Sequence, residues 1–425
     1  MVKVNIDAVV HGMVAGKDIS GQHGLLLLPK GTVISEEHLR SMRAFGVRDV
    51  EILAPQPDTD GQDEADDGDF AETLARCRAL LRPRFAALDI AAPFGQAVFE
   101  LAAGRAASRA LAEGLDLDAA ALTPSLTGFA PERQLFGPET IDPASLVSGE
   151  VELATLPEVH VRLLSALEAE NTTPQDLAAI IGRDPSLSAK LLRLVNSPHY
   201  AARTPIDSIT RAVAMVGRKE LTTLVLGLAA LTAFDDIEPG LWDMRAFWRH
   251  AAACAVYASL LAAACPGTAS DRAFVGGLLH DIGQLVILRK LPAAAARALL
   301  LSRVEGLPDT EAETAVLGFD HALVGQTLLT GWHFPETLTR LVADHHQPPS
   351  DAASRETALV HVADILATAW SWPAFSGSPV PALREAAWQS LGLPEYLLPE
   401  VAAAGDDRIR DIEAVFFRRD QGKPQ

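Results

Sequence analysis

The stretch AFVGGLLHDIGQLVILRKL, from Ala273 to Leu291, is mostly apolar, yet it places two ionisable side chains next to each other, at His280 and Asp281. A helix with so few polar positions is expected to be buried on nearly all sides. A carboxylate in such a place costs several kcal/mol unless a partner charge, hydrogen bonds or a metal ion compensates it. We therefore expect polar groups or a metal ion to surround His280 and Asp281.

Composition favours a mainly helical protein. The chain has 425 residues, of which 48% are hydrophobic and only 6% aromatic, so it is long enough for two or three domains. Its net charge of −19 disfavours direct binding to nucleic acid or to an anionic membrane. There is no signal-peptide pattern, so we expect a cytoplasmic location. Cys77, Cys254 and Cys265 are interpreted as small core residues in a reducing compartment.

The first third of the chain consists of three segments that differ in composition. Residues 1–54 combine alternating apolar positions, glycines and a helix start at Ser35, which predicts a small α+β module with a strand, a hairpin, a helix and a strand. Residues 55–69 hold seven carboxylates and no basic residue, so we expect a solvated linker. Residues 70–149 are predicted to form Ala-rich helices, a packing or dimer surface, followed by a Pro-containing linker.

From residue 150 onward a helix start or stop signal recurs about every fifteen to twenty residues. This pattern predicts an all-helical domain over residues 150–375 and a helical extension over 376–425. One of its helices is expected to run from Asp271 to Lys290. Five successive helices each carry a candidate metal ligand. These candidates are His250, the pair His280 and Asp281, His321, the pair His345 and His346, and Asp364.

The residue types of this set indicate which metal it would hold. Imidazole and carboxylate together suit divalent transition metals such as Fe, Mn, Co, Ni or Zn, whereas an all-carboxylate set would suggest Mg or Ca. Ligands from separate helices commonly close a metal site within a helical bundle. A metal held in this way can acidify a bound water for attack on a phosphoester.

Several motifs carry a resemblance to a known family. GLLHDIGQLV, HALVGQTLLTGWHFP, ADHHQP and HVADILA resemble the HD superfamily of metal-dependent phosphohydrolases. Together with LPEVHVRLLSAL and IIGRDPSLSAKLLRLVNSPHY, they are more similar to the HDOD domain, a bacterial signalling relative, over roughly Val151 to Ala369. The segment GLLLLPKGTVISEEHLRSMRAFGV is similar to the one that often precedes HD-GYP domains. The resemblance implies an HD-type helical bundle.

The resemblance also implies roles for the candidate ligands. The positions that match the family's ligands of a first metal ion are His250, His280, Asp281 and Asp364. The positions that match the further ligands of the HD-GYP branch are His321, His345 and His346.

This sequence departs from the HD-GYP pattern at three places. Gln284 stands where those enzymes have a lysine that faces the substrate phosphate. Residues 347–350 (QPPS) replace the Gly-Tyr-Pro loop, and Ala246 replaces a glutamate one turn before the first histidine. Hydrolysis of cyclic di-GMP is therefore not expected.

Three hypotheses for function remain open. In the first, a bacterial signalling protein uses its HDOD domain to bind proteins or to sense a ligand. A bound metal or nucleotide and a homo-oligomeric state are compatible with this hypothesis. In the second, the chain is a metal-dependent phosphohydrolase for a nucleotide or another phosphoester, with Asp281 as the catalytic-site residue. In the third, His280 and Asp281 are a hydrogen-bonded structural pair without metal, and His345-His346 only caps a helix.

Five other positions are assigned no role in chemistry. Asn196, with the Ser-Pro that follows it, is interpreted as a helix stop. The histidines outside the motif positions are interpreted as surface or core residues, and they are His160, His199, His333 and His361.

Overall fold

The structure is a computed structural model. It describes residues 63–115, 142–148, 172–197, 206–217, 243–349, 355–370 and 378–417, together with short pieces and single positions between 2 and 52, at 117, and between 162 and 234. The chain divides into two compact units, residues 1–69 and residues 70–425.

The first unit contains two small antiparallel ladders. Strand β1 (Val2–Asn5) pairs with β4 (Asp49–Ile52), and β2 (Ile19–Ser20) pairs with β3 (Leu26–Leu28). The order strand, hairpin, strand agrees with the sequence-based expectation. Of the helix expected over residues 35–45, only residues 38 and 42 are described, and both are helical.

From Asp63 onward the regular secondary structure of the described residues is helical. Its α-helices are α2 (Asp63–Leu81), α3 (Pro93–Glu113), α4 (Pro143–Ser148), α6 (Pro174–Ile181), α7 (Pro185–Val195), α8 (Ile209–Val216), α10 (Met244–Ala264), α11 (Ser270–Leu279), α12 (Ile282–Lys290), α13 (Pro292–Glu305), α14 (Asp309–Leu317), α15 (His321–Gly331), α16 (Glu336–Ala343), α17 (Arg355–Trp370), α18 (Glu385–Leu391) and α19 (Leu398–Phe417). None of the described helices is both long and apolar enough to cross a membrane.

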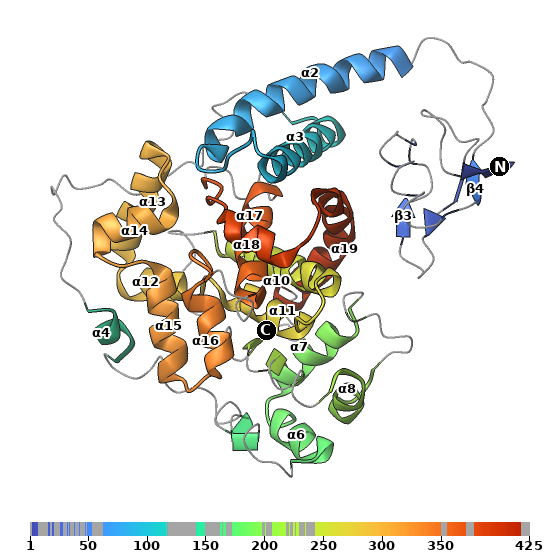
Figure 1. Ribbon diagram of the computed structural model, residues 1–425. Coiled ribbons are helices and arrows are strands. Elements are labelled where there is room, and N and C mark those ends of the chain that lie inside the picture. Colours follow the sequence, from blue (N-terminus) through green and yellow to red (C-terminus); the bar gives the residue numbers. More distant parts are fainter. Residues whose placement is uncertain are drawn as a thin grey trace, which may run out of the picture. The chain divides into compact units, whose positions relative to one another are not determined.

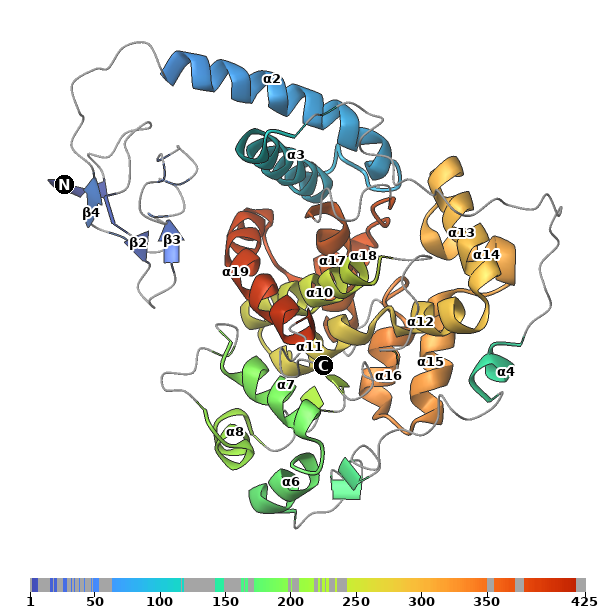
Figure 2. The ribbon, with the colours of Figure 1, turned by 180° about the vertical axis from the view of Figure 1, so that it is seen from behind.

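Helices α10, α11 and α17 form the middle of the larger unit, with α6 to α8 on one side and α12 to α16 on the other (Figures 1 and 2). Helix α10 is buried over most of its length because alanines cover much of its surface. Gly277 of α11 lies so close to α10 that a Cβ there would come within 2.8 Å of the Cys254 carbonyl oxygen. Small residues thus allow the central helices to pack backbone against backbone. The fold is an all-helical HD-type bundle, as expected.

Single hydrogen bonds fix both ends of α7. Asp184 caps α7 by accepting a bond of 2.9 Å from the Leu187 N–H. The Asn196 side chain accepts from the Ile206 N–H and donates to the Ile206 carbonyl oxygen, both at 2.7 Å. Asn196 therefore joins the end of α7 to Ile206, which agrees with the structural role expected for it.

The expected continuous helix from Asp271 to Lys290 is wrong. Helix α11 ends at Leu279, α12 begins at Ile282, and His280 and Asp281 occupy the turn between them. Asp281 has φ −94° and ψ 10°, the bridge region of backbone conformations, where many active-site residues lie. The apolar pattern continues through the turn because both helices are buried, so periodicity gave no sign of the break.

Two linker boundaries also need correction. Helix α2 begins at Asp63, inside the segment 55–69 that we expected to be a solvated linker. Acidic residues are common in the first turns of helices in general, so acidic composition alone did not distinguish a linker from a helix start. The short helix α4 lies in the segment expected to be a Pro-containing linker.

The contact between α12 and α15 depends on two glycines. A Cβ on Gly283 would lie 2.0 Å from the His321 carbonyl oxygen and 2.7 Å from the Gly325 nitrogen. A Cβ on Gly325 would lie 2.7 Å from Val342 of α16. Because these neighbours of Gly283 are backbone atoms, they cannot move away as a flexible side chain could. The glycines thus allow α15, which begins at His321, to lie directly against α12 and close to α16.

We therefore expect Gly283→Ala to lower the free energy of unfolding by about 3 kcal/mol or more, because it forces α12 away from α15. Gly104→Ala in α3 is the matched control, since a Cβ there meets nothing within 4 Å. That substitution should raise stability by up to about 1 kcal/mol through helix propensity. Urea unfolding of both variants measures the difference, and equal stabilities would contradict the proposed close contact.

Candidate metal centre

The first group of polar side chains joins three helices or their ends. His250 from α10, His280 from the turn after α11, and Asp364 from α17 place their ligand atoms within 4.8 Å of one another. His250 Nε2 lies 3.2 Å from Asp364 Oδ1 and 3.2 Å from His280 Nε2. All three side chains are buried, so solvent does not compensate their charges.

The second group lies beside the first. It consists of Asp281, His321 at the start of α15, and His345 and His346 after α16, again with ligand atoms within 4.8 Å of one another. His321 Nε2 lies 3.0 Å from Asp281 Oδ1 and 2.9 Å from His346 Nε2. His345 Nε2 is 3.9 Å from the same Asp281 oxygen. Among these residues only His346 is partly exposed.

The Asp281 carboxylate connects the two groups. Its Oδ2 lies 3.3 Å from His280 Nε2 and 3.6 Å from His250 Nε2, while its Oδ1 faces His321 and His345. One oxygen thus points into each group. A carboxylate placed in this way can bridge two ions, which in two-metal hydrolytic sites lie about 3.5–4 Å apart.

Hydrogen bonds on the far side of three imidazole rings turn the Nε2 atoms toward the centre. His280 Nδ1 lies 2.7 Å from the Gly277 carbonyl oxygen, and His345 Nδ1 lies 2.7 Å from the Val342 carbonyl oxygen. His321 Nδ1 lies 2.7 Å from a Glu313 carboxylate oxygen, which also accepts from the His321 N–H. Each oxygen accepts the Nδ1 proton, so in the neutral ring the Nε2 lone pair faces inward.

The spacing of the nitrogens fits a metal. Two neutral imidazole lone pairs that face each other at 2.9 or 3.2 Å repel unless a proton or a cation lies between them. Adjacent ligands around an ion with bonds of about 2.1 Å are separated by roughly 3 Å, which is the observed spacing. His345 Nε2 is buried and has no hydrogen-bond partner among the described residues. The donor set therefore fits two divalent transition-metal ions.

Electrostatics separate the histidines into two kinds. Burial opposes protonation of His280 and of His321, but nearby carboxylates, Asp281 for His280 and Glu313 with Asp281 for His321, outweigh burial and hold both pKa values well above the usual range. Burial and the positive charges of His280 and His321 lower the pKa of His345 to about 3. Without metal, protons on His280 and His321 compensate Asp281, while His345 stays neutral.

The structure brings all seven predicted ligand residues together: His250, His280, Asp281, His321, His345, His346 and Asp364. That these residues bind metal stays a prediction. Sequence reasoning missed Glu313, whose only signal is a carboxylate within a helix whose neighbours Ala312, Val316 and Leu317 are apolar and buried. It assigned His361 to the surface or core without a role, although this residue lies one turn before Asp364 and is in contact with His345.

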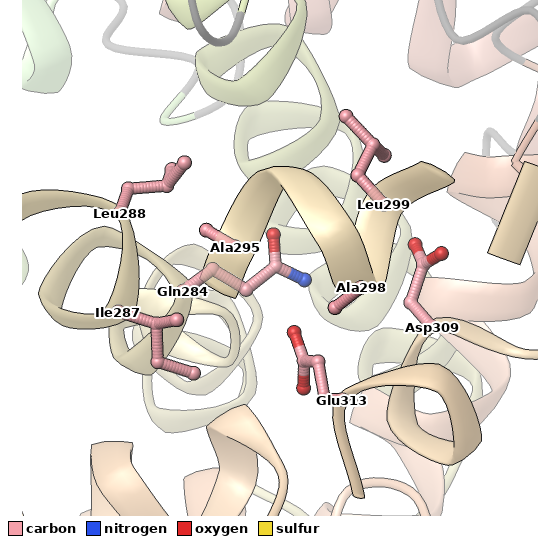
Figure 3. Close-up of a pocket in the computed structure, with 8 residues that line it drawn as sticks. All are labelled: Gln284, Ile287, Leu288, Ala295, Ala298, Leu299, Asp309 and Glu313. Atoms are coloured by element: carbon pink, nitrogen blue, oxygen red, sulfur yellow. The ribbon is translucent and has the colours of Figure 1, made fainter. Parts of the chain in front are cut away.

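Gln284, which replaces the lysine of the HD-GYP pattern, lines a separate pocket beside Glu313. The Gln284 amide and the Glu313 carboxylate point into the same space, and Asp309 lies across it (Figure 3). The pocket holds about 330 Å³, part of it open to solvent. The carbonyl oxygen of Gln284 is buried and has no hydrogen-bond partner in the described part of the chain. With two carboxylates nearby, this pocket disfavours a phosphate group.

Comparison with known proteins supports the resemblance to the HDOD domain. Residues 153–348 match the HDOD domain, so the chain contains an HDOD domain. An uncharacterized protein of Treponema pallidum (strain Nichols) is 26% identical over 211 residues, which are 48% of this chain and 40% of that protein. The chain thus spans less than half the length of this curated relative.

Two solved structures share the fold. A candidate phosphohydrolase of Shewanella amazonensis SB2B matches with a TM-score of 0.52 and 26% identity, covering 64% of this chain and 98% of that one. An HDOD domain protein with unknown function from Geobacter sulfurreducens matches with a TM-score of 0.54 and 24% identity, covering 65% and 98%.

The unpaired Gln284 carbonyl leads to a stability prediction. Gln284→Met keeps the volume and removes a buried acceptor without a partner, so the free energy of unfolding should be unchanged or higher by up to about 1 kcal/mol. Gln284→Glu should lower it by about 2 kcal/mol or more at neutral pH, because it adds a carboxylate beside Glu313. Chemical unfolding of both variants tests this, and a strongly destabilised Met variant would mean that the amide has a partner in solution.

Proposed function

We propose that the two ligand groups of the HDOD domain would hold two divalent transition-metal ions, and that the domain acts as a metal-dependent signalling module that binds a ligand or partner protein. The observation that carries the proposal is that two ligand groups share the Asp281 carboxylate, one oxygen to each. A metal ion bound there would be a Lewis acid that lowers the pKa of a coordinated water. Glu313 would orient His321, and backbone carbonyls would orient His280 and His345.

The surroundings of the site argue against hydrolysis of cyclic di-GMP. Gln284 offers no positive charge to a phosphate. It lies beside the negatively charged carboxylates of Glu313 and Asp309 and not beside a positively charged side chain. The residues after His345 and His346 are Gln347, Pro348 and Pro349 in place of the Gly-Tyr-Pro loop. The groups that would hold this substrate in the HD-GYP branch are therefore replaced.

A second candidate function is hydrolysis of another phosphoester, such as a nucleotide. The bridging position of Asp281 favours it, because a carboxylate-bridged ion pair can bind and polarise a phosphoester. The similarity to the candidate phosphohydrolase of Shewanella amazonensis SB2B points in the same direction. In this function the seven ligand residues would hold the ions, and partly exposed His346 would mark the side from which substrate approaches.

Metal content tests the proposal directly. Elemental analysis of the purified protein should find about two transition-metal ions per chain. Asp281→Asn, which preserves the side-chain volume, should lose most of both ions, whereas His346→Ala should lose mainly the second ion. His333→Asn is the matched control, since His333 is exposed, lies outside both groups and has φ 56°, which Asn tolerates. Absence of metal from wild type after expression in metal-supplemented medium would refute the proposal.

Turnover distinguishes the two candidate functions. The metal-loaded wild type would be assayed with a phosphate monoester and a phosphate diester, p-nitrophenyl phosphate and bis(p-nitrophenyl) phosphate. Metal without turnover is the expected result for a signalling module. Turnover that disappears in Asp281→Asn and persists in His333→Asn would replace the proposal with the phosphohydrolase.

A further inference from the structure

His361 is a buried histidine whose two ring nitrogens are both used by the backbone. It lies on α17, three residues before Asp364, and is 1% exposed. Its Nε2 accepts a bond of 3.0 Å from the Arg384 N–H. Its Nδ1 must then carry the proton, which it donates to the His345 carbonyl oxygen at 2.8 Å. Although His361 lies next to the metal centre, neither ring nitrogen is left to bind an ion.

The hydrogen bond from His361 means that both the ring and the backbone of His345 are held by hydrogen bonds. The His345 ring is fixed through Nδ1 to the Val342 carbonyl oxygen, and its own carbonyl oxygen is fixed by His361. The turn that carries His345 and His346 is therefore held from α17 as well as from α16. A rotation of this turn would move two of the three histidines of the second ligand group, His345 and His346, whereas the first ligand group would stay in place.

Arg384 lies outside the segment that matches the HDOD domain, which ends at residue 348. It precedes α18 in an extended stretch that is itself anchored to the bundle. The Val380 N–H donates to the Arg84 carbonyl oxygen at 2.7 Å, and Ser378 accepts from Arg84 and from Arg303 through its carbonyl and hydroxyl oxygens. The C-terminal extension thus reaches the metal centre by a line of hydrogen bonds from the Arg384 N–H through His361 to His345.

We infer that residues 378–391 control the second metal position: the Arg384 N–H and His361 position the His345-His346 turn, and release of this segment weakens binding of the second ion. The inference rests on the metal binding proposed above. His361 is a positioning residue in this arrangement and binds no ion. A partner protein that displaced the segment would change the domain from a two-metal to a one-metal state.

A single backbone donor can be removed to test this. Arg384 is exposed and has φ −81°, which proline can adopt. Its N–H is not part of the α18 ladder, since Arg384 contributes its carbonyl oxygen to Ala387 and Trp388. Arg384→Pro therefore removes the bond to His361, and Arg384→Ala is the control that changes the side chain and keeps the N–H.

We expect Arg384→Pro to weaken binding of the second ion about tenfold to hundredfold, the usual effect of losing an outer hydrogen bond of a metal site, and to leave the first ion unchanged. Arg384→Ala should bind both ions as wild type does. Titration of the metal-free protein with Mn²⁺ or Zn²⁺, followed by calorimetry, measures both affinities. Equal second-site affinities in the two variants would overturn the inference.

A measurement without metal separates this inference from the metal proposal. In the metal-free protein, amide hydrogen exchange of residues 344–347 should be faster in Arg384→Pro than in Arg384→Ala. If wild type binds no metal, the proposed function fails, but this exchange difference still tests the positioning role. Unchanged exchange in Arg384→Pro would refute that role.

A second pair of variants guards against misfolding of the proline variant. His361→Asn places an amide near the position of Nδ1 and can still donate to the His345 carbonyl oxygen. His361→Gln reaches the position of Nε2 and loses that bond. The second ion should bind more weakly to the Gln variant than to the Asn variant, and the reverse order would contradict the inference.

Discussion

The buried carboxylate of Asp281 is the constraint on which the rest of the domain depends. A negative charge in this apolar interior requires compensation from the protein, and the histidines around it come from α10, α15 and the turns after α11 and α16. They reach Asp281 only because α11 and α12 separate at this residue and because Gly283 lets α12 contact α15 through the backbone. The helix break and the close glycine contact are thus consequences of one requirement for charge compensation.

The same requirement links the proposed metal binding to the protonation of the histidines. The raised pKa values of His280 and His321 mean that the folded, metal-free domain holds protons that the unfolded chain releases near pH 6.5. The stability that these protons provide is fully present below that pH and is lost as pH rises through the raised pKa values. A metal ion requires neutral imidazoles, so its binding displaces the protons and strengthens as pH rises. Either protonated histidines or a bound metal ion can therefore compensate the negative charge of Asp281.

The sequence was sufficient to predict the helical bundle and to select seven side chains that the structure brings together, because helix caps are local and these residues stand in recognisable motifs. Asp184 before Pro185 and Asp320 before His321 are N-cap signals that can be read from the sequence, and both side chains cap helices in the structure. The helix break at Asp281 could not be predicted, because one continuous buried helix and two consecutive buried helices give the same apolar sequence pattern. Glu313 and His361 were missed for another reason: their contacts join helices, and no local spacing shows which buried polar groups meet.

The contacts around α17 also show that the segment matching the HDOD domain is smaller than the structural unit. Asp364, a member of the first ligand group, lies beyond residue 348, where the match ends. Helix α17 in turn is held by segments outside the match: the Trp370 indole N–H donates to the Val98 carbonyl oxygen of α3, and Arg84 donates to the Thr368 carbonyl oxygen at the end of α17. Helix α19 packs on α10, where buried Glu413 accepts from Arg249, the neighbour of His250. The helices before and after the matched segment therefore complete the fold around the candidate metal centre, so a displacement of these helices would act on the residues that position its side chains.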